Sequence, residues 1–185
     1  MGTDKGVLAW HGTEQRYHMA GLLQRLCHAV FLSCRSDQQA AINPRYPSLT
    51  DGKPGLGPAG GILTAFGHDP SSAWLVTACD LPLLDAETLQ YLIRHRNPHS
   101  LATTFKSPHD GLPEPLVTIW EPASYPVLQR FAAQGITCPR KVLLNSKVTI
   151  IEPIYPDALR NANTPADAET VQQLLHKQSM LPDAR

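Results

Sequence analysis

Apolar and polar positions follow two different spacings along this chain. In some segments the apolar residues recur at helical spacing, and in others they form the short runs that are typical of buried strands. The segments that predict strands are 29–34, 73–79, 101–105, 115–120 and 148–151. The segments that predict helices are 19–30, 58–66, 86–93, 123–134, 140–144 and 165–175. Strands that alternate with helices indicate an α/β fold with a mostly parallel sheet.

Local signals mark the ends of several elements. Pro58 suits the first turn of a helix, and Asp85 is a suitable N-cap for the next one. Gly135 ends the helix that precedes it. Thr164 and Pro165 form a cap and a first-turn proline ahead of the last helix. Because the 185 residues contain no repeat, low-complexity run or linker, we predict a single domain over residues 1–185.

Composition excludes several classes of function. Sixteen Lys and Arg residues balance 16 Asp and Glu residues without any basic run, which argues against binding a nucleic acid polymer. The chain has no apolar stretch of bilayer length and no secretory signal, so we expect no membrane contact and a cytoplasmic location. Its four cysteines have neither C-x-x-C nor zinc-ligand spacing, and we interpret them as reduced thiols.

Asp80 is the strongest candidate for chemistry. It directly follows the predicted strand 73–79, which places it at the carboxyl edge of the sheet, where open α/β folds bind ligands. Pro82 cannot extend that strand, so the chain turns there. A carboxylate in this place suits Mg²⁺, which takes one or two protein oxygens and shares the rest with phosphates and water. The alternative, an Asp80 that only caps the next turn, stays equally open at this point.

Three further segments are weaker candidates. Residues 55–61 are rich in glycine and precede a helix, so their backbone either approaches a ligand or forms a plain surface loop. Lys5 lies between glycines and either neutralises a phosphate or belongs to a solvated terminus. Asn163 precedes the last helix, where Thr164 is the better cap, so the Asn163 amide is open to a ligand.

Taken in order, these motifs resemble the molybdenum cofactor guanylyltransferase family. The motifs are 1–6, 57–61, 79–82 and 163–165, and the likeness runs from residue 1 to about 175. Glu114-Pro115-Leu116 also stands where that family has a short polar-Pro motif. Each motif is weak alone, but several in register across one chain are specific.

The resemblance implies a Rossmann-like, three-layer nucleotidyltransferase that transfers GMP from GTP to the phosphate of molybdopterin and releases pyrophosphate. Asp80 and Lys5 are the implied catalytic residues: Asp80 holds the Mg²⁺ cofactor, and Lys5 offsets phosphate charge. Glu114 and Asn163 lie on the side of the acceptor, which is molybdopterin or the molybdenum cofactor. The implied nucleotide-binding residues are Lys5, Asp51, Gly57, Pro58, Ala59, Gly60 and Asp80. Transient contact with other cofactor-biosynthesis proteins is also implied.

Two departures from the family pattern stand out. The family begins with a strand and a glycine-rich phosphate loop that ends in Arg-Met-Gly, and this sequence starts at the corresponding Met1. We expect the reading frame to continue upstream into an apolar strand followed by Gly-Gly. The second departure is at 32–35, which read Leu-Ser-Cys-Arg where the family often has an asparagine.

Two other functions stay open on the sequence. One is a related transferase that uses CTP or loads another phosphorylated acceptor, because Asp80 and Lys5 suit any nucleoside triphosphate. The other is a non-catalytic module that has lost the phosphate loop. The presence of Asp80, Lys5 and Asn163 favours an enzyme, since a module without catalysis has no chemical need for them.

Overall fold

Helices and strands alternate along the chain, as the sequence predicts. The computed structural model describes residues 5–52 and 55–180, with side chains through Lys177. The α-helices are α1 Gln15–Gln24, α2 Pro58–His68, α3 Ala86–Arg94, α4 Ser124–Ala133, α5 Pro139–Leu144 and α6 Pro165–Met180. The strands are β1 Leu32–Cys34, β2 Ser48–Thr50, β3 Trp74–Thr77, β4 Ala102–Lys106, β5 Pro113–Trp120 and β6 Thr149–Ile151. Short 3-10 helices are η1 Lys5–Val7, η2 Gln39–Ala41 and η3 Pro156–Leu159.

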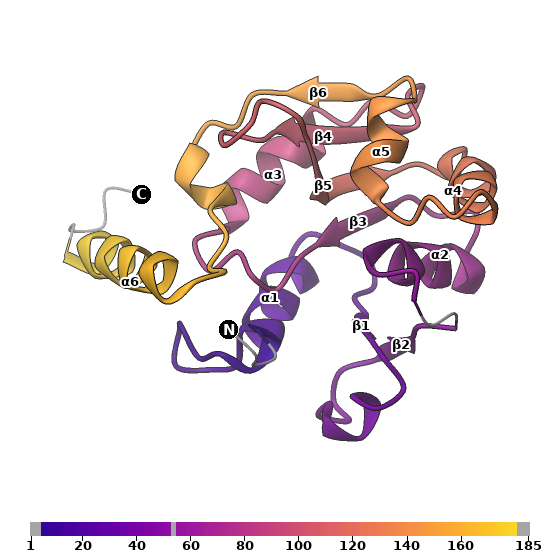
Figure 1. Cartoon of the computed structure of the whole chain (residues 1–185). Coiled ribbons are helices and arrows are strands. Elements are labelled where there is room, and N and C mark those ends of the chain that lie inside the picture. Colours follow the sequence, from indigo (N-terminus) through magenta and orange to yellow (C-terminus); the bar gives the residue numbers. More distant parts are fainter. Residues whose placement is uncertain (1–4, 53–54, 181–185) are drawn as a thin grey trace.

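The strands form two separate sheets in the described part of the chain. A four-stranded sheet has the order β3-β5-β4-β6, and a two-stranded sheet joins β1 to β2 (Figure 1). β1 and β2 are parallel, and so are β4 and β6. β5 runs antiparallel to both β3 and β4, which therefore point the same way. Within the larger sheet β5 alone is reversed, so the sheet is mostly parallel in direction.

Helices cover both faces of the larger sheet, which gives three layers. Side chains on β5 alternate between the faces, as the pleat of a strand requires. Val117 and Ile119 pack in a core with α1 and α3, whereas Trp120 packs in a second core with α2, α4 and α5. The α1/α3 core includes Phe105 and Leu89, both fully buried. The predicted α/β architecture with three layers is confirmed.

Capping explains where the helices begin. Pro58 occupies the first turn of α2, as predicted. The Asp85 carboxylate accepts the Thr88 N–H at 2.8 Å and caps α3. At the start of α6 the bonds are reciprocal: Thr164 Oγ1 accepts the Asp167 N–H at 3.1 Å, and Asp167 Oδ2 accepts the Thr164 N–H at 2.8 Å.

Several element boundaries differ from the sequence prediction, most of all around the first helix. α1 ends at Gln24, and the strand begins at Leu32, so the apolar positions predicted on one helical face past Gln24 lie in the connection between them. Leu26 still packs against the α1/α3 core although it lies outside the helix. The apolar spacing past Gln24 therefore reflects burial of these side chains and not helical structure. β2 was not predicted, because its sequence Ser-Leu-Thr has a single apolar residue, Leu49, and so shows no apolar run. None of the described helices is both long and apolar enough to cross a membrane.

Candidate active site at the carboxyl edge of the sheet

Asp80 lies in the turn just after β3, at the sheet edge where the sequence placed it. Its own carbonyl oxygen accepts the Ala162 N–H at 2.9 Å, which ties the turn to the segment before α6. Leu81 is buried beneath it, and His11 Nε2 lies 2.8 Å from the Pro82 carbonyl oxygen. The turn is therefore fixed on three sides, and the Asp80 side chain is held at one place on the edge.

Lys5 joins two distant parts of the chain at this edge. Its Nζ donates to Asp80 Oδ2 at 3.1 Å and also to Asn163 Oδ1. The side chains of Lys5 and Asp80 are 32% and 23% exposed, so a ligand can reach both. The predicted motif around Lys5 includes residues 1–4, which lie outside the described residues. The structure thus brings together Lys5, Asp80 and Asn163, three residues that the sequence could only propose separately.

The Asn163 side chain is available because other groups cap α6. The reciprocal bonds of Thr164 and Asp167 satisfy the helix start, and the Asn163 N–H also donates to Asp167 Oδ2 at 3.1 Å. Its side-chain oxygen instead accepts from Lys5. The capping prediction for Thr164 is confirmed, and the Asn163 amide points to the candidate site.

Glu114 sits on β5 within electrostatic reach of Asp80. Burial raises the pKa of the Glu114 carboxyl, and the Asp80 charge raises it further, while the Leu116 N–H and Arg140 oppose the shift. Arg140 Nη1 lies 2.6 Å from Asp110 Oδ2, and Arg140 Nη2 lies 3.5 Å from Glu114 Oε2. The sequence assigned Arg140 only to a helical segment, because no motif marks it or Asp110.

The glycine-rich loop lies on the other side of β3, next to the end of β2. Gly57 has a φ of 52°, a backbone conformation that glycine adopts without strain, and the next residue opens α2. Asp51 Oδ1 accepts the Ser33 Oγ–H at 3.0 Å. A methyl group on Gly61 would lie 2.5 Å from Ser33 Oγ, so α2 approaches β1 closely at this point.

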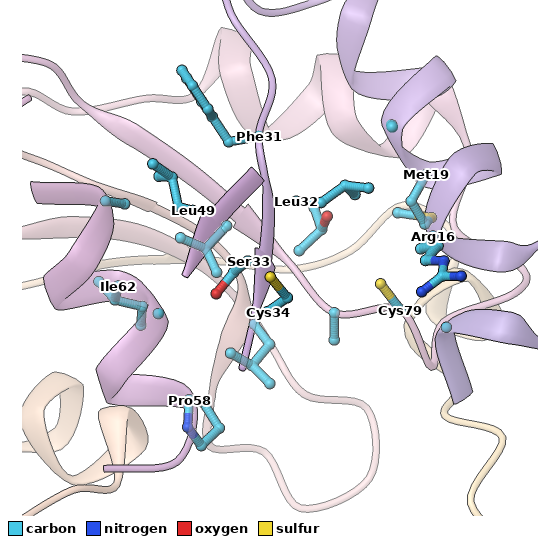
Figure 2. A pocket seen from close by; sticks show the side chains of 18 of the residues that line it. Arg16, Met19, Phe31, Leu32, Ser33, Cys34, Leu49, Pro58, Ile62 and Cys79 are labelled. Carbon is cyan, nitrogen blue, oxygen red and sulfur yellow. The ribbon is translucent and has the colours of Figure 1, made fainter. Parts of the chain in front are cut away.

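A cavity of about 330 Å³ opens between β1 and β3. Asp51, Gly57 and Pro58 line it, as do Gly6 and Cys79, the neighbours of Lys5 and Asp80 in the sequence. Figure 2 shows Ser33 and Cys34 of β1 near the middle of the cavity, with Pro58 and Ile62 on one side and Cys79 on the other. Two predicted nucleotide contacts, Ala59 and Gly60, are buried in α2 and do not line the cavity.

The donors at the edge are the hard oxygens that Mg²⁺ prefers. Asp80 Oδ2 and Asn163 Oδ1 already converge on one cation, the Lys5 ammonium, and Glu114 adds a nearby carboxyl. Among residues 5–52 and 55–180 no group of three or more His, Cys, Asp or Glu side chains forms a metal cluster. A site with one or two protein oxygens fits Mg²⁺, which shares its remaining ligand positions with phosphates and water.

Comparison with known proteins decides the family. Residues 1–149 match the family model described as "MobA-like NTP transferase domain", which covers most of the chain. The chain belongs to this family. Its members are nucleotidyltransferases, which places this chain in that enzyme class, and nucleotidyltransferases of this family generally use a divalent metal ion.

Individual relatives agree with the MobA-like assignment. The chain is 31% identical over 168 residues to a molybdenum cofactor biosynthesis bifunctional protein from Synechocystis sp., matching 90% of this chain but 48% of that protein. The chain therefore spans about half the length of this bifunctional relative. It is 28% identical over 179 residues to a probable molybdenum cofactor guanylyltransferase from Carboxydothermus hydrogenoformans, matching 91% of this chain and 87% of the relative.

Solved structures share the fold. Molybdopterin-guanine dinucleotide biosynthesis protein A from Archaeoglobus fulgidus matches with a TM-score of 0.77 at 22% identity, covering 95% of this chain and 92% of that one. A 2-C-methyl-D-erythritol 4-phosphate cytidylyltransferase from Thermus thermophilus matches with a TM-score of 0.65 at 14% identity, covering 93% and 94%. Both confirm the Rossmann-like nucleotidyltransferase fold of this MobA-like chain.

The close packing of Gly61 on Ser33 predicts that Gly61→Ala changes the free energy of unfolding in opposite directions with and without the Ser33 hydroxyl. In the native background, Gly61→Ala should lower the free energy of unfolding by about 1 kcal/mol, because the methyl group meets Ser33 Oγ. In a Ser33→Ala background the same change should stabilise the protein by up to about 1 kcal/mol, since alanine favours a helix. Denaturant unfolding of the four proteins measures both values.

Gly67 provides the matched control for this cycle, because it lies in the same helix and a methyl group there would meet nothing closer than Tyr125 Oη at 3.9 Å. Gly67→Ala should be neutral or stabilising in both backgrounds. An equal effect of Gly61→Ala with and without the Ser33 hydroxyl would show that α2 does not pack on β1 in this way.

Proposed function

We propose that this chain transfers GMP from GTP to the phosphate of molybdopterin and releases pyrophosphate. The observation that carries the proposal is the convergence of Lys5, Asp80 and Asn163 beside the cavity at the carboxyl edge of the sheet. Membership of the MobA-like family and the guanylyltransferase names of several relatives support the choice of substrates. A cytoplasmic location stays a prediction from the sequence.

The reaction needs positioned charges rather than a nucleophilic side chain. An oxygen of the acceptor phosphate forms a bond to the α-phosphorus of GTP, and the bond from that phosphorus to the β-phosphate bridging oxygen breaks. Lys5 offsets negative charge on the α- and β-phosphates. Asp80 would hold Mg²⁺, which when bound neutralises phosphate charge and fixes the geometry of the triphosphate.

On the acceptor side, Glu114 and Asn163 would orient the attacking phosphate. Asn163 donates from its amide nitrogen once its oxygen is bound to Lys5. The Glu114 carboxyl, whose pKa burial raises, lies beside the positive charge of Arg140. This pairing limits the repulsion that a second carboxylate near Asp80 would exert on an incoming phosphate.

The other side of the cavity supports recognition of guanine. Asp51 and the Gly57–Pro58 turn line it, next to the start of α2. Guanine carries two neighbouring N–H donors on one edge, and a carboxylate accepts such a pair well. Asp51, which accepts the Ser33 hydroxyl at 3.0 Å and lines the cavity, would be this carboxylate.

Binding of nucleotides tests the choice of GTP. In titration calorimetry with Mg²⁺, we expect micromolar binding of GTP and at least about 10-fold weaker binding of CTP and ATP. Asp51→Asn should reduce this preference, because the amide offers guanine only one acceptor oxygen and places a donor against it. Glu152→Gln is the matched control, since Glu152 is 74% exposed and pairs with Lys106 on β4. Preferred binding of CTP would instead assign the chain to the cytidylyltransferase type.

A further inference from the structure

The first α-helix carries a polar residue at a buried position. The buried residues of α1 are Gln15, Met19 and Ala20, and the Gln15 side chain is fully buried. Gln15 and Met19 are four positions apart and so lie on one face of the helix, and Met19 packs with Leu81 in the α1/α3 core. An apolar side chain of similar size would fill such a position at least as well. Packing alone therefore does not account for a glutamine here.

The Gln15 side chain reaches the turn that carries Asp80. Its Nε2 donates to the Leu81 carbonyl oxygen at 3.4 Å. The Pro82 carbonyl oxygen lies 2.8 Å from His11 Nε2, and His11 is the donor because a carbonyl oxygen only accepts. The Asp80 carbonyl oxygen accepts a backbone N–H from the segment before α6. Three consecutive carbonyl oxygens of the turn are thus held by separate donors, and two of these donors are side chains.

The Gln15 amide is only half satisfied. Among residues 5–52 and 55–180 its Oε1 has no hydrogen-bond partner. A buried acceptor without a partner destabilises the folded state. The Leu81 carbonyl oxygen also accepts the Leu84 N–H at 3.2 Å, so an apolar residue at position 15 would not leave that oxygen alone. Gln15 therefore does not add to the stability of the fold, which points to a role in the site.

His11 is held beside the turn by a second histidine. The ring of His11 stacks on the ring of His18 in α1, with the centroids 3.7 Å apart and the planes inclined by 12°. The stack fixes the plane of the His11 ring, and its Nε2 edge faces the Pro82 carbonyl oxygen. Gln15 and His18 belong to the same helix, so α1 supports both side-chain contacts with the turn.

We propose that Gln15 is a positioning residue for the Asp80 carboxylate, with His11 as its partner on the next carbonyl of the turn. Asp80 directly precedes Leu81, so a shift of the Leu81 peptide moves the carboxylate that pairs with Lys5. The amide supplies a fixed donor from the first turn of α1, and its unpaired oxygen lowers stability. The expected effect on turnover rests on the proposed function, whereas the effect on the turn does not.

Gln15→Met in the full chain tests the proposal, because it removes the amide and nearly keeps the volume of the side chain. We expect an equal or higher midpoint of thermal unfolding together with a loss of at least about 10-fold in kcat for pyrophosphate release. Hydrogen exchange of the Ala162 amide, which bonds to the Asp80 carbonyl oxygen, reports on the turn without any substrate and should become at least about 5-fold faster. The Glu121 amide bonds to the Leu101 carbonyl oxygen instead and should not change.

Thr88→Val is the matched control. Thr88 Oγ1 in α3 is also buried and has no partner in the described part of the chain, so this variant should likewise keep or gain stability. It should leave both kcat and the exchange of the Ala162 amide unchanged. His11→Phe keeps a ring to stack on His18 but cannot donate, and it should lower kcat. His11→Gln restores a donor and should recover most of the loss.

Two results would overturn the proposal. A lower unfolding midpoint of Gln15→Met with unchanged exchange of the Ala162 amide would show that the glutamine stabilises the core and not the turn. Equal losses of kcat in Gln15→Met and Thr88→Val would show a general effect of altered packing. A native chain that releases no pyrophosphate from any nucleoside triphosphate would contradict the proposed function, and the exchange of the Ala162 amide would then decide the role of Gln15 by itself.

Discussion

Asp80→Ala is expected to lower kcat/KM for nucleotidyl transfer by roughly 10³-fold, with little loss of stability. The side chain is the carboxylate on which Lys5 converges at the sheet edge, and no other described carboxylate shares both that place and that partner. The turn itself is held by the backbone of Asp80, whose carbonyl oxygen accepts from Ala162. Removal of the carboxylate therefore leaves the loop in place and removes only the charge.

Steady-state pyrophosphate release at increasing Mg²⁺ concentration measures this effect. Asp80→Asn, which preserves the shape of the side chain, should be nearly as inactive, because the amide supplies a weaker metal ligand. Asp157→Asn is a suitable control, since Asp157 of η3 is exposed and pairs with Arg160, the residue after η3. Activity of Asp80→Ala within about 3-fold of the native protein would remove Asp80 from the catalytic site.

Lys5→Ala should have the second largest effect, and it should act in opposite directions on nucleotide and metal. Loss of the ammonium should weaken binding of the nucleoside triphosphate by about 10²-fold, because the phosphate charge is no longer offset. The same change frees Asp80 Oδ2 and Asn163 Oδ1, so Mg²⁺ alone should bind more tightly than before. Lys5→Arg should restore part of the nucleotide affinity, since the charge returns with a different shape.

Calorimetric titrations of GTP and of Mg²⁺, each without the other, separate the two effects. Lys106→Ala provides the control, because Lys106 forms an ion pair with Glu152 that is exposed and does not involve Asp80 or Asn163. If Lys5→Ala binds GTP as tightly as the native protein does, the lysine is a structural link between Asp80 and Asn163 and not a phosphate ligand.

Sequence signals predicted the parts of the fold that local chemistry determines. Pro58, Asp85 and Thr164 mark helix starts that depend on neighbouring backbone groups, and the structure confirms each of them. The end of α1 could not be predicted, because Leu26 contributes to the core from outside the helix and so continues the apolar pattern. β2 has only one apolar residue, Leu49, and so shows no strand pattern.

The candidate site was predictable as single residues and not as an arrangement. Asp80 follows a strong strand signal, whereas the contact of Lys5 with Asn163 joins residues that are 158 positions apart. Arg140 carries no motif and emerges only through its contacts with Glu114 and Asp110. The family resemblance is confirmed, whereas the roles of the individual residues and the single-domain organisation stay predictions.

The most direct test of the proposed function is to incubate the protein with Mg²⁺, molybdopterin and GTP labelled at the α-phosphate, and to identify the labelled product. The proposal predicts that the label moves to the pterin as a guanine dinucleotide, with one pyrophosphate released for each transfer, and that Asp80→Ala forms none. Transfer from CTP in preference to GTP, or release of pyrophosphate with no label on the pterin, would contradict it.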